Sequence, residues 1–111
     1  MSAKFEVLKA SNGQFYFHLK AINGEIILAS EQYVAKTKAE EGIASVKVNA
    51  PNDANYERKT SQGAQPYFVL KAANGEPLGR SEMYSSTEAM ETGISSVKSN
   101  APGASVDDLA K

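Results

Sequence analysis

Residues Asn74–Pro102, NGEPLGRSEMYSSTEAMETGISSVKSNAP, repeat a stretch that the chain has already used 51 residues earlier, Asn23–Pro51, NGEIILASEQYVAKTKAEEGIASVKVNAP. When the comparison starts at Phe17 and Phe68, the copies align without a gap over 35 positions, and 19 of these are identical. A duplication of this length predicts that the chain contains two copies of one structural unit.

The length of the chain predicts that the two copies share one hydrophobic core. The chain has 111 residues, so each copy has about half of them, and a unit that small buries too little of its surface to be stable alone. The sequence contains no cysteine, which excludes disulfides and thiolate metal sites as a substitute for a core. We therefore expect a single domain over residues 1–111, with repeats at 1–53 and 54–111.

Each copy begins with extended segments that are separated by turn signals. In the first copy, Ser11-Asn12-Gly13 precedes the apolar run Phe15–Leu19, and Asn23-Gly24 precedes Glu25–Ala29. The first extended segment is Phe5–Ala10. Strands joined by Asn-Gly turns form antiparallel hairpins, so this pattern predicts a three-stranded meander.

The register of the second hairpin can be predicted by comparing the copies. A three-residue loop places Leu19 opposite Ile27, and the corresponding loop places Leu70 opposite Leu78, so both copies gain the same apolar pair. A two-residue loop instead places Leu19 opposite Leu28, whose counterpart is Gly79. The first hairpin, with the same loop type, pairs Val7 with Phe17 and Phe5 with Leu19. The predicted core face is Phe5, Val7, Phe15, Phe17, Leu19 and Ile27.

A helix is predicted after the third strand of each copy, over Lys36–Asn49 and Thr87–Asn100. Small and apolar residues recur there at helical spacing, and Pro51 and Pro102 end the two segments. The buried faces are predicted to be Ala39, Gly42, Ile43, Val46 and Ala50, and Met90, Gly93, Ile94, Val97 and Ala101. Two capping boxes, Thr37 with Glu40 and Ser85 with Glu88, are out of phase and leave the helix starts open.

Gly42 and Gly93 lie within these buried helix faces. A glycine inside a helix costs about 1 kcal/mol relative to alanine. The interpretation we favour is a close approach of the helix to the sheet or to the other helix. A hinge or a contact between ligand and backbone is the alternative.

The segment 52–65 joins the copies, and Tyr56–Thr60 within it aligns with Phe5–Lys9, so it is predicted to be a strand. Pro66 suits a sheet edge or the start of a strand. In the tail, 103–111, Val106 and Leu109 could form a brief strand or pack as irregular chain.

The tandem units NGE, SExY and GI.SVK.NAP, in this order and at a fixed offset, resemble the YegP-like family of small bacterial proteins over nearly the whole chain. This resemblance implies an α+β fold of two β-β-β-α(-β) repeats. They share one antiparallel sheet with two helices on one face, related by a pseudo-twofold axis. It further implies that the strand after each helix joins the sheet of the other repeat. It implies no established activity.

The residues give little support for catalysis. The only histidine is His18, on the strand face opposite Phe17 and Leu19, where a solvent-facing side chain is the simplest interpretation. The sequence has no cysteine nucleophile and no Gly-x-Ser-x-Gly, Walker or dinucleotide-binding motif. We therefore predict a non-catalytic binding or structural module without a cofactor or metal.

One duplicated constellation is a candidate ligand site: Ser30, Glu31 and Tyr33, with Ser81, Glu82 and Tyr84. Serine and glutamate between a strand and a helix can satisfy backbone donors, and a tyrosine can bury its ring, so a structural role is the interpretation we favour. The alternative is a pair of pseudo-symmetric clefts that bind a small polar ligand or a peptide.

Charge and hydropathy limit the possible partners. The net charge is −1 and no basic run occurs, so the charge pattern argues against a nucleic-acid partner, although Tyr16, His18 and Lys20 could lie on an exposed sheet face. No apolar stretch reaches the length that spans a membrane. A third possibility is a protein-interaction module that acts through the open sheet face or the edge near Pro66. We expect a monomer in the cytoplasm.

Overall fold

The computed structural model describes residues 3–110, so Met1, Ser2 and Lys111 of the predicted domain lie outside the described residues. It contains seven strands, two α-helices and one short 3-10 helix. In chain order these are β1 (Lys4–Lys9), β2 (Phe15–Lys20), β3 (Ile26–Ala29), α1 (Lys36–Asn49), η1 (Asp53–Asn55), β4 (Tyr56–Thr60), β5 (Pro66–Lys71), β6 (Pro77–Arg80), α2 (Thr87–Asn100) and β7 (Ser105–Asp108).

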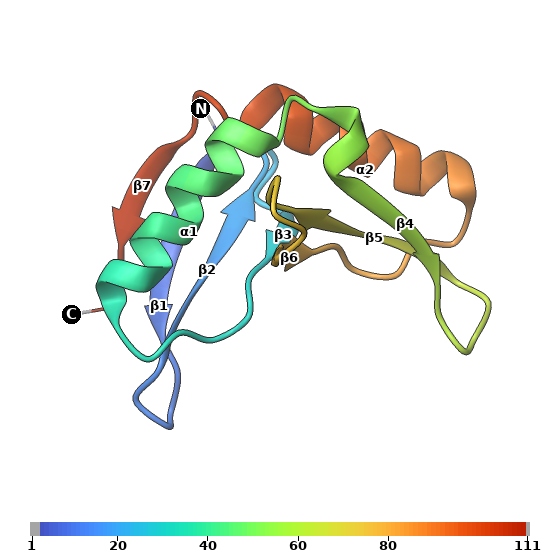
Figure 1. Cartoon of the computed structure of the whole chain (residues 1–111). Coiled ribbons are helices and arrows are strands. Elements are labelled where there is room, and N and C mark those ends of the chain that lie inside the picture. The colour runs from blue at the N-terminus through green and yellow to red at the C-terminus, as the bar shows by residue number, and fades with distance from the viewer. Residues whose placement is uncertain (1–2, 111) are drawn as a thin grey trace.

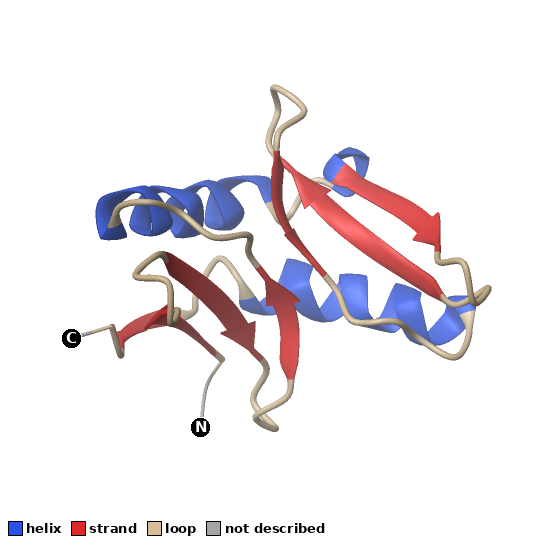
Figure 2. Cartoon of the chain, turned by 90° about the horizontal axis from the view of Figure 1, so that it is seen from below, coloured by secondary structure: helices blue, strands red, loops and turns tan. Residues whose placement is uncertain are grey.

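All seven strands belong to one sheet in the order β4-β5-β6-β3-β2-β1-β7. Both helices lie on the same face of this sheet (Figure 1), and Figure 2 shows the other face with the helices behind the strands. The predicted α+β class, with two repeats that share a sheet, is therefore confirmed. Strands β3 and β6 are neighbours at the centre, where the residue pair Ala29–Arg80 joins the two repeats.

The two strands that follow the helices lie where the family resemblance places them. β4 follows α1 and pairs with β5 of the second repeat, whereas β7 follows α2 and pairs with β1 of the first. The sheet is antiparallel except for the β1–β7 pair, which is parallel. At the 51-residue offset β7 corresponds to 54–57, at the start of β4. Because β4 pairs with β5, the equivalent place for β7 would be beside β2. That place is occupied by β1, so β7 pairs with the outer edge of β1 and runs parallel to it.

The first hairpin has the predicted register, with Val7 opposite Phe17 and Phe5 opposite Leu19. The second hairpin has the predicted three-residue loop, because Ala21 N donates to Glu25 O at 2.9 Å and Gly24 has φ 87°. Beyond this loop, however, the predicted Leu19–Ile27 and Leu70–Leu78 pairs are wrong.

A β-bulge causes this difference in register. Leu19 pairs with Leu28 and Leu70 with Gly79, because the register shifts by one residue between Leu19 and Lys20 and at the same place in the second repeat. A bulge sets two residues of one strand against a single residue of its neighbour. Consecutive residues Ile27 and Leu28 can therefore both be buried, at 7% and 0% exposure.

Both helices occupy the predicted residues and bury the predicted faces. Neither predicted capping box forms. The residue before α1 is Ala35, which has no side-chain cap, and α2 is capped by Ser86, whose hydroxyl accepts a hydrogen bond from Ala89 N at 3.1 Å. Pro66 is the first residue of β5, an interior strand, where it lies opposite Thr60. It therefore marks a strand start and not the sheet edge.

The helices connect the two repeats through the core. α1 packs on β1 and β2 of its own repeat and on β5 and β6 of the other, and α2 packs on β5 and also on β3. The largest fully buried side chains come from both repeats: Phe5, Phe17, Phe68, Leu19, Leu28, Leu70, Ile94, Val7, Val46 and Val97. Apolar burial of this kind is the main stabilising contribution to folding, and here it depends on both halves.

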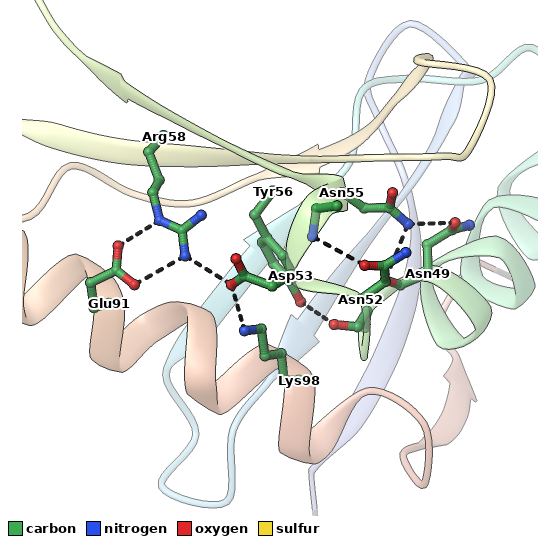
Figure 3. A network of polar contacts seen from close by, with 10 residues as sticks. Asn49, Asn52, Asp53, Asn55, Tyr56, Arg58, Glu91 and Lys98 are labelled. Carbon is green, nitrogen blue, oxygen red and sulfur yellow. Dashed lines mark hydrogen bonds and ion pairs between the residues drawn. The ribbon is translucent and has the colours of Figure 1, made fainter.

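A polar network covers one corner of the second repeat (Figure 3). The Arg58 Nε and Nη2 atoms donate to the two Glu91 carboxylate oxygens at 2.6 and 3.0 Å, and Nη2 also donates to Asp53 Oδ1 at 2.9 Å. Lys98 Nζ donates to the same Asp53 oxygen at 2.6 Å. The counterpart of Arg58 in the first repeat is the buried Val7, whose carbonyl accepts a hydrogen bond from Leu109 N beside β7. The network therefore lies where, within residues 3–110, no strand pairs outside β4 as β7 pairs outside β1.

This network predicts a loss of stability in acid. Hydrogen bonds from Lys98 and Arg58 lower the pKa of Asp53, and hydrogen bonds from Arg58 lower the pKa of Glu91. A carboxyl whose pKa is lower in the folded chain stabilises the fold above its unfolded-state pKa, and this contribution disappears as the pH falls through the folded-state pKa. On acidification, we expect the wild type to lose more free energy of unfolding than Arg58→Gln, so that the two proteins converge.

Urea unfolding over a pH series at low ionic strength would measure this difference. Added salt should reduce it, since these groups are exposed and screened. A gap between wild type and Arg58→Gln that stays constant from neutral to acidic pH would contradict the assignment of the pH effect to this network.

Candidate functional site

The helix-free face of the sheet carries a continuous row of side chains from all seven strands. Successive cross-strand partners in this row are Glu57, Val69, Arg80, Ala29, His18, Glu6 and Asp107. Their strand neighbours Tyr56, Phe68 and Phe17 are buried on the helix side, as expected when side chains alternate between the faces of a sheet.

Two hollows lie on this face beside the junction of β3 and β6. Cleft A has a volume of about 440 Å³ and cleft B about 570 Å³. Cleft A is lined by Ala29, Ser30, Glu31, Glu57, Lys59, Val69, Lys71, Gly75, Pro77, Gly79 and Arg80. Cleft B is lined by Lys20, Gly24, Glu25, Ile26, Leu28, Ala29, Arg80, Ser81 and Glu82.

The clefts correspond to one another through the sequence duplication. Ser30, Glu31 and Lys71 in cleft A are matched by Ser81, Glu82 and Lys20 in cleft B. In each case the serine and glutamate come from one repeat and the lysine from the other. Neither repeat therefore contains a complete cleft.

The two serines have a structural role at the strand ends. Ser30 Oγ accepts a hydrogen bond from Phe17 N at 2.9 Å and donates to Glu31 O at 2.7 Å. Ser81 makes the same two contacts, with Phe68 N and Glu82 O. Each serine hydroxyl thus accepts a hydrogen bond from a strand N–H group in place of a backbone carbonyl. This agrees with the interpretation that the Ser-Glu-x-Tyr segments have a structural role.

The two tyrosines do not line the clefts. The Tyr33 ring stacks on Phe17 and the Tyr84 ring on Phe68, each with a centroid separation of 6.3 Å. Burial, followed by the charges of Glu31 and Glu76, raises the pKa of Tyr33, and burial with Glu82 and Glu25 raises that of Tyr84. Both phenols therefore remain protonated at neutral pH.

The predicted glutamates do line the clefts. Glu31 lines cleft A and Glu82 lines cleft B, and both side chains are exposed. Each is joined by a carboxylate from the hairpin of the other repeat. Glu25 lines cleft B, and Glu76 lies between Gly75 and Pro77 of cleft A. The lining of cleft B thus holds two carboxylates and one lysine, whereas the lining of cleft A holds the carboxylates of Glu31 and Glu57 and two lysines.

The corresponding lysines of the two clefts have equivalent partners, because Glu57 is the counterpart of Glu6 at the 51-residue offset. Lys71 Nζ lies 2.8 Å from Glu57 Oε1, and Lys20 Nζ lies 3.1 Å from Glu6 Oε1. Arg80 lines both clefts. Sequence reasoning missed it. The sequence feature that could have identified Arg80 is its position directly before the repeated Ser-Glu pair, where the first copy has Ala29.

His18 is half-buried instead of solvent-facing. Its ring lies 5.3 Å from that of Tyr16, and its Nδ1 atom is buried without a hydrogen-bond partner within residues 3–110. Burial lowers the pKa of His18, and the nearby carboxylate of Glu6 opposes this shift. The imidazole is therefore neutral at physiological pH. His18 does not line either cleft.

The tyrosines explain the helix glycines. A Cβ atom placed on Gly42 would lie 2.8 Å from Tyr33 Oη and 3.0 Å from Phe17 Cε2. A Cβ atom on Gly93 would overlap Tyr84 Oη and lie 2.7 Å from its Cζ atom. The helices thus approach both the sheet and the aromatic ring that precedes each helix.

We expect Gly93→Ala to destabilise the protein by about 1–3 kcal/mol, which is the usual cost of overpacking. Without this contact, the substitution would stabilise a helix by about 1 kcal/mol. The overlap with the stacked ring of Tyr84 therefore reverses the sign of the expected stability change. Chemical denaturation of Gly93→Ala would measure the change.

Two further variants separate this effect from that of alanine itself. Tyr84→Phe removes the hydroxyl, so the cost of Gly93→Ala should decrease in that background. Gly103→Ala is a matched control, because no atom lies within 4 Å of its added Cβ, and we expect a change below about 0.5 kcal/mol. A stabilised Gly93→Ala would show that the ring moves aside freely.

The sequence matches a known family in both repeats. The model of DUF1508, described as a domain of unknown function, matches residues 10–57 and 61–108. The chain belongs to the DUF1508 family. A UPF0339 protein of Bordetella pertussis is 57% identical over 108 residues, covering 97% of this chain and 96% of the relative. The UPF0339 protein YegP of Escherichia coli is 51% identical over 108 residues, covering 97% and 98%. The YegP-like resemblance is thereby confirmed.

Two solved structures of similar proteins have the same fold. The solution NMR structure of yegP from E. coli, titled a protein of unknown function, matches with a TM-score of 0.94 at 50% identity. That match covers 99% of this chain and 95% of the relative. A UPF0339 protein of Shewanella oneidensis matches with a TM-score of 0.93 at 48% identity, covering 99% and 93%. Within residues 3–110, no helix is long and apolar enough to cross a membrane.

Proposed function

We propose that this DUF1508 protein is a non-catalytic binding module of the bacterial cytoplasm that holds a small polar ligand in clefts A and B. The observation that carries this proposal is the correspondence of the two clefts, each assembled from both repeats around a Ser-Glu segment and a lysine. A volume of several hundred Å³ with a few convergent polar groups is typical of small-molecule sites.

The charges of the clefts support a polar ligand. Carboxylates of Glu31 and Glu82 are exposed there, so they can accept hydrogen bonds from a ligand without a large desolvation cost. The titratable groups nearby support binding over catalysis. The phenols of Tyr33 and Tyr84 have raised pKa values and face the helices, so neither serves as a general base at neutral pH.

A metabolite screen by thermal shift, followed by NMR mapping of backbone amides, tests the proposal. We expect a polar metabolite to raise the melting temperature and to shift the amides of residues that line the clefts. The double variant Glu31→Gln, Glu82→Gln should reduce this response and leave the fold of the free protein unchanged.

The matched control is Glu41→Gln with Glu88→Gln, which removes the same charge from exposed helix positions outside the clefts. This variant should respond to the metabolite like the wild type. A screen without a response, or a ligand that shifts only amides on the helix side, would contradict the proposal.

A second candidate function is strand addition at the outer edge of β4. Ser61 N donates to Gln65 O at 2.9 Å, so the alternation of an antiparallel ladder directs the backbone groups of Arg58 and Thr60 away from β5. Within residues 3–110, β4 has no strand on that side, whereas β1 has β7. A partner segment would add a strand there.

Thr60→Pro tests this candidate, because it removes an outward N–H group but no bond to β5. A protein partner recovered from lysate should be lost with Thr60→Pro and kept with Glu31→Gln, Glu82→Gln. Retention of the partner by Thr60→Pro would exclude the β4 edge as its binding site.

A further inference from the structure

The two clefts meet at one guanidinium group. Ala29 and Arg80 form the residue pair that joins β3 to β6, and both residues line both clefts. They occupy corresponding positions in the two repeats, so the pseudo-twofold axis passes between them. The duplication therefore provides two sets of carboxylates and lysines but only one arginine at the axis.

Arg80 differs from the lysines of this face in having no partner. Lys20 is paired with Glu6, and Lys71 with Glu57. Arg80 is exposed, and no hydrogen bond or ion pair of its side chain is present within residues 3–110. A guanidinium presents N–H donors in a planar fork that matches the two oxygens of a carboxylate. The donors of Arg80 are therefore available to a ligand from either cleft.

The carboxylates of the clefts restrict the class of ligand. The lysines that line the clefts are paired, Lys20 with Glu6, and Lys59 and Lys71 with Glu57. Within residues 3–110 no ion pair is formed by Glu31 of cleft A or by Glu25 and Glu82 of cleft B. A molecule with several negative charges would be repelled by these groups. A molecule with one carboxylate and one ammonium group finds an opposite charge for each end.

We propose that each chain binds one small zwitterion, an amino acid or a short peptide, with its carboxylate on Arg80 and its ammonium group on the carboxylates of cleft A or cleft B. This inference rests on the proposed function and adds its ligand class and stoichiometry. Since one guanidinium serves both clefts, a ligand in one cleft excludes a second ligand from the other.

NMR titration of the full chain with defined probes tests this inference. The zwitterionic probes are glycine, β-alanine, 4-aminobutyrate and diglycine, which differ in the separation of their charges. Butyrate and butylamine carry one charge each and serve as controls. We expect one zwitterion to shift the amides around Ala29 and Arg80 with one ligand per chain, and both controls to bind more weakly. Arg80→Gln should weaken binding by about tenfold or more, because charge-assisted hydrogen bonds are lost.

Two variants use the pseudo-symmetry as a control. Arg80→Ala combined with Ala29→Arg moves the guanidinium to the corresponding position, so binding of one ligand per chain should be retained. Ala29→Arg alone provides a second guanidinium and should allow two ligands per chain. Both variants change exposed or half-buried positions, and their melting temperatures report whether the fold is intact.

The outcomes separate this inference from the proposed function. A cleft ligand that binds Arg80→Gln as tightly as the wild type, or two ligands per wild-type chain, would overturn the role of Arg80 and leave cleft binding intact. If no zwitterion shifts the cleft amides while the metabolite screen finds another cleft ligand, the ligand class is wrong. If the screen is also without a response, the proposed function itself fails.

Discussion

Fragments 1–53 and 54–111, expressed separately, are expected to lose cooperative unfolding as single chains. Residues 1–53 contain β1, β2, β3 and α1, but α1 also packs on β5 and β6, and the outer edge of β1 is covered by β7. The separated fragment would expose both contacts. A chain of about fifty residues already buries a small fraction of its surface, so the loss of this shared core should remove its net stability.

Thermal melting with sedimentation analysis checks this expectation. The control is the intact chain with a protease site inserted between Asp53 and Ala54, the boundary of the two fragments, which should melt like the wild type before cleavage. Mixing the two fragments should restore the transition. A fragment that folds only as a dimer agrees with a shared core, because a second copy supplies the missing half. A fragment with the mass of one chain and a cooperative melt would refute it.

Leu28→Ala is expected to cost about 2–5 kcal/mol, the usual range for removing a fully buried leucine. Leu28 is 0% exposed and lies at the junction of the repeats, where its counterpart in the second repeat is Gly79. A Cβ atom on Gly79 would lie 2.9 Å from Leu28 Cγ and 3.0 Å from Ala29 O. The leucine of one repeat therefore fills the space that the glycine of the other leaves open.

This packing predicts that Leu28→Ala and Gly79→Ala are coupled. Gly79→Ala alone should cost about 1–3 kcal/mol through overpacking. In the Leu28→Ala background its cost should fall, because the leucine contact is gone, although the contact with Ala29 O remains. Urea unfolding of the two single variants and the double variant measures the coupling. Additive changes within about 0.5 kcal/mol would show that the two positions are independent.

Local patterns predicted the elements of this fold. The helix spans Lys36–Asn49 and Thr87–Asn100 agree with the structure, because the spacing of buried residues and the following prolines act within a few residues of one another. The pairing of Val7 with Phe17 agrees because the first hairpin is regular. The Leu19–Ile27 pairing is wrong because a β-bulge shifts the register between Leu19 and Lys20, which the loop length alone does not predict.

Four of the six residues named as a candidate ligand site, Ser30, Glu31, Ser81 and Glu82, line the clefts, and the two tyrosines do not. Glu31 and Glu82 line the clefts, as one of the two readings of the Ser-Glu-x-Tyr segments required, whereas Tyr33 and Tyr84 pack against glycines of the helices. Spacing along the chain cannot tell which face of the sheet a side chain reaches after a strand ends. The contribution of Arg80 required knowledge of its neighbour across the sheet.

The sequence by itself determined that the protein consists of two like units with one interior, since periodicity and repetition are properties of the order of residues. Only the tertiary structure decided that β7 lies parallel to β1 and that Ala29 meets Arg80 at the axis. The physical reason is that both depend on contacts between segments far apart in the chain. Competition for the edge of β2 sets the first, and the packing of β3 on β6 sets the second.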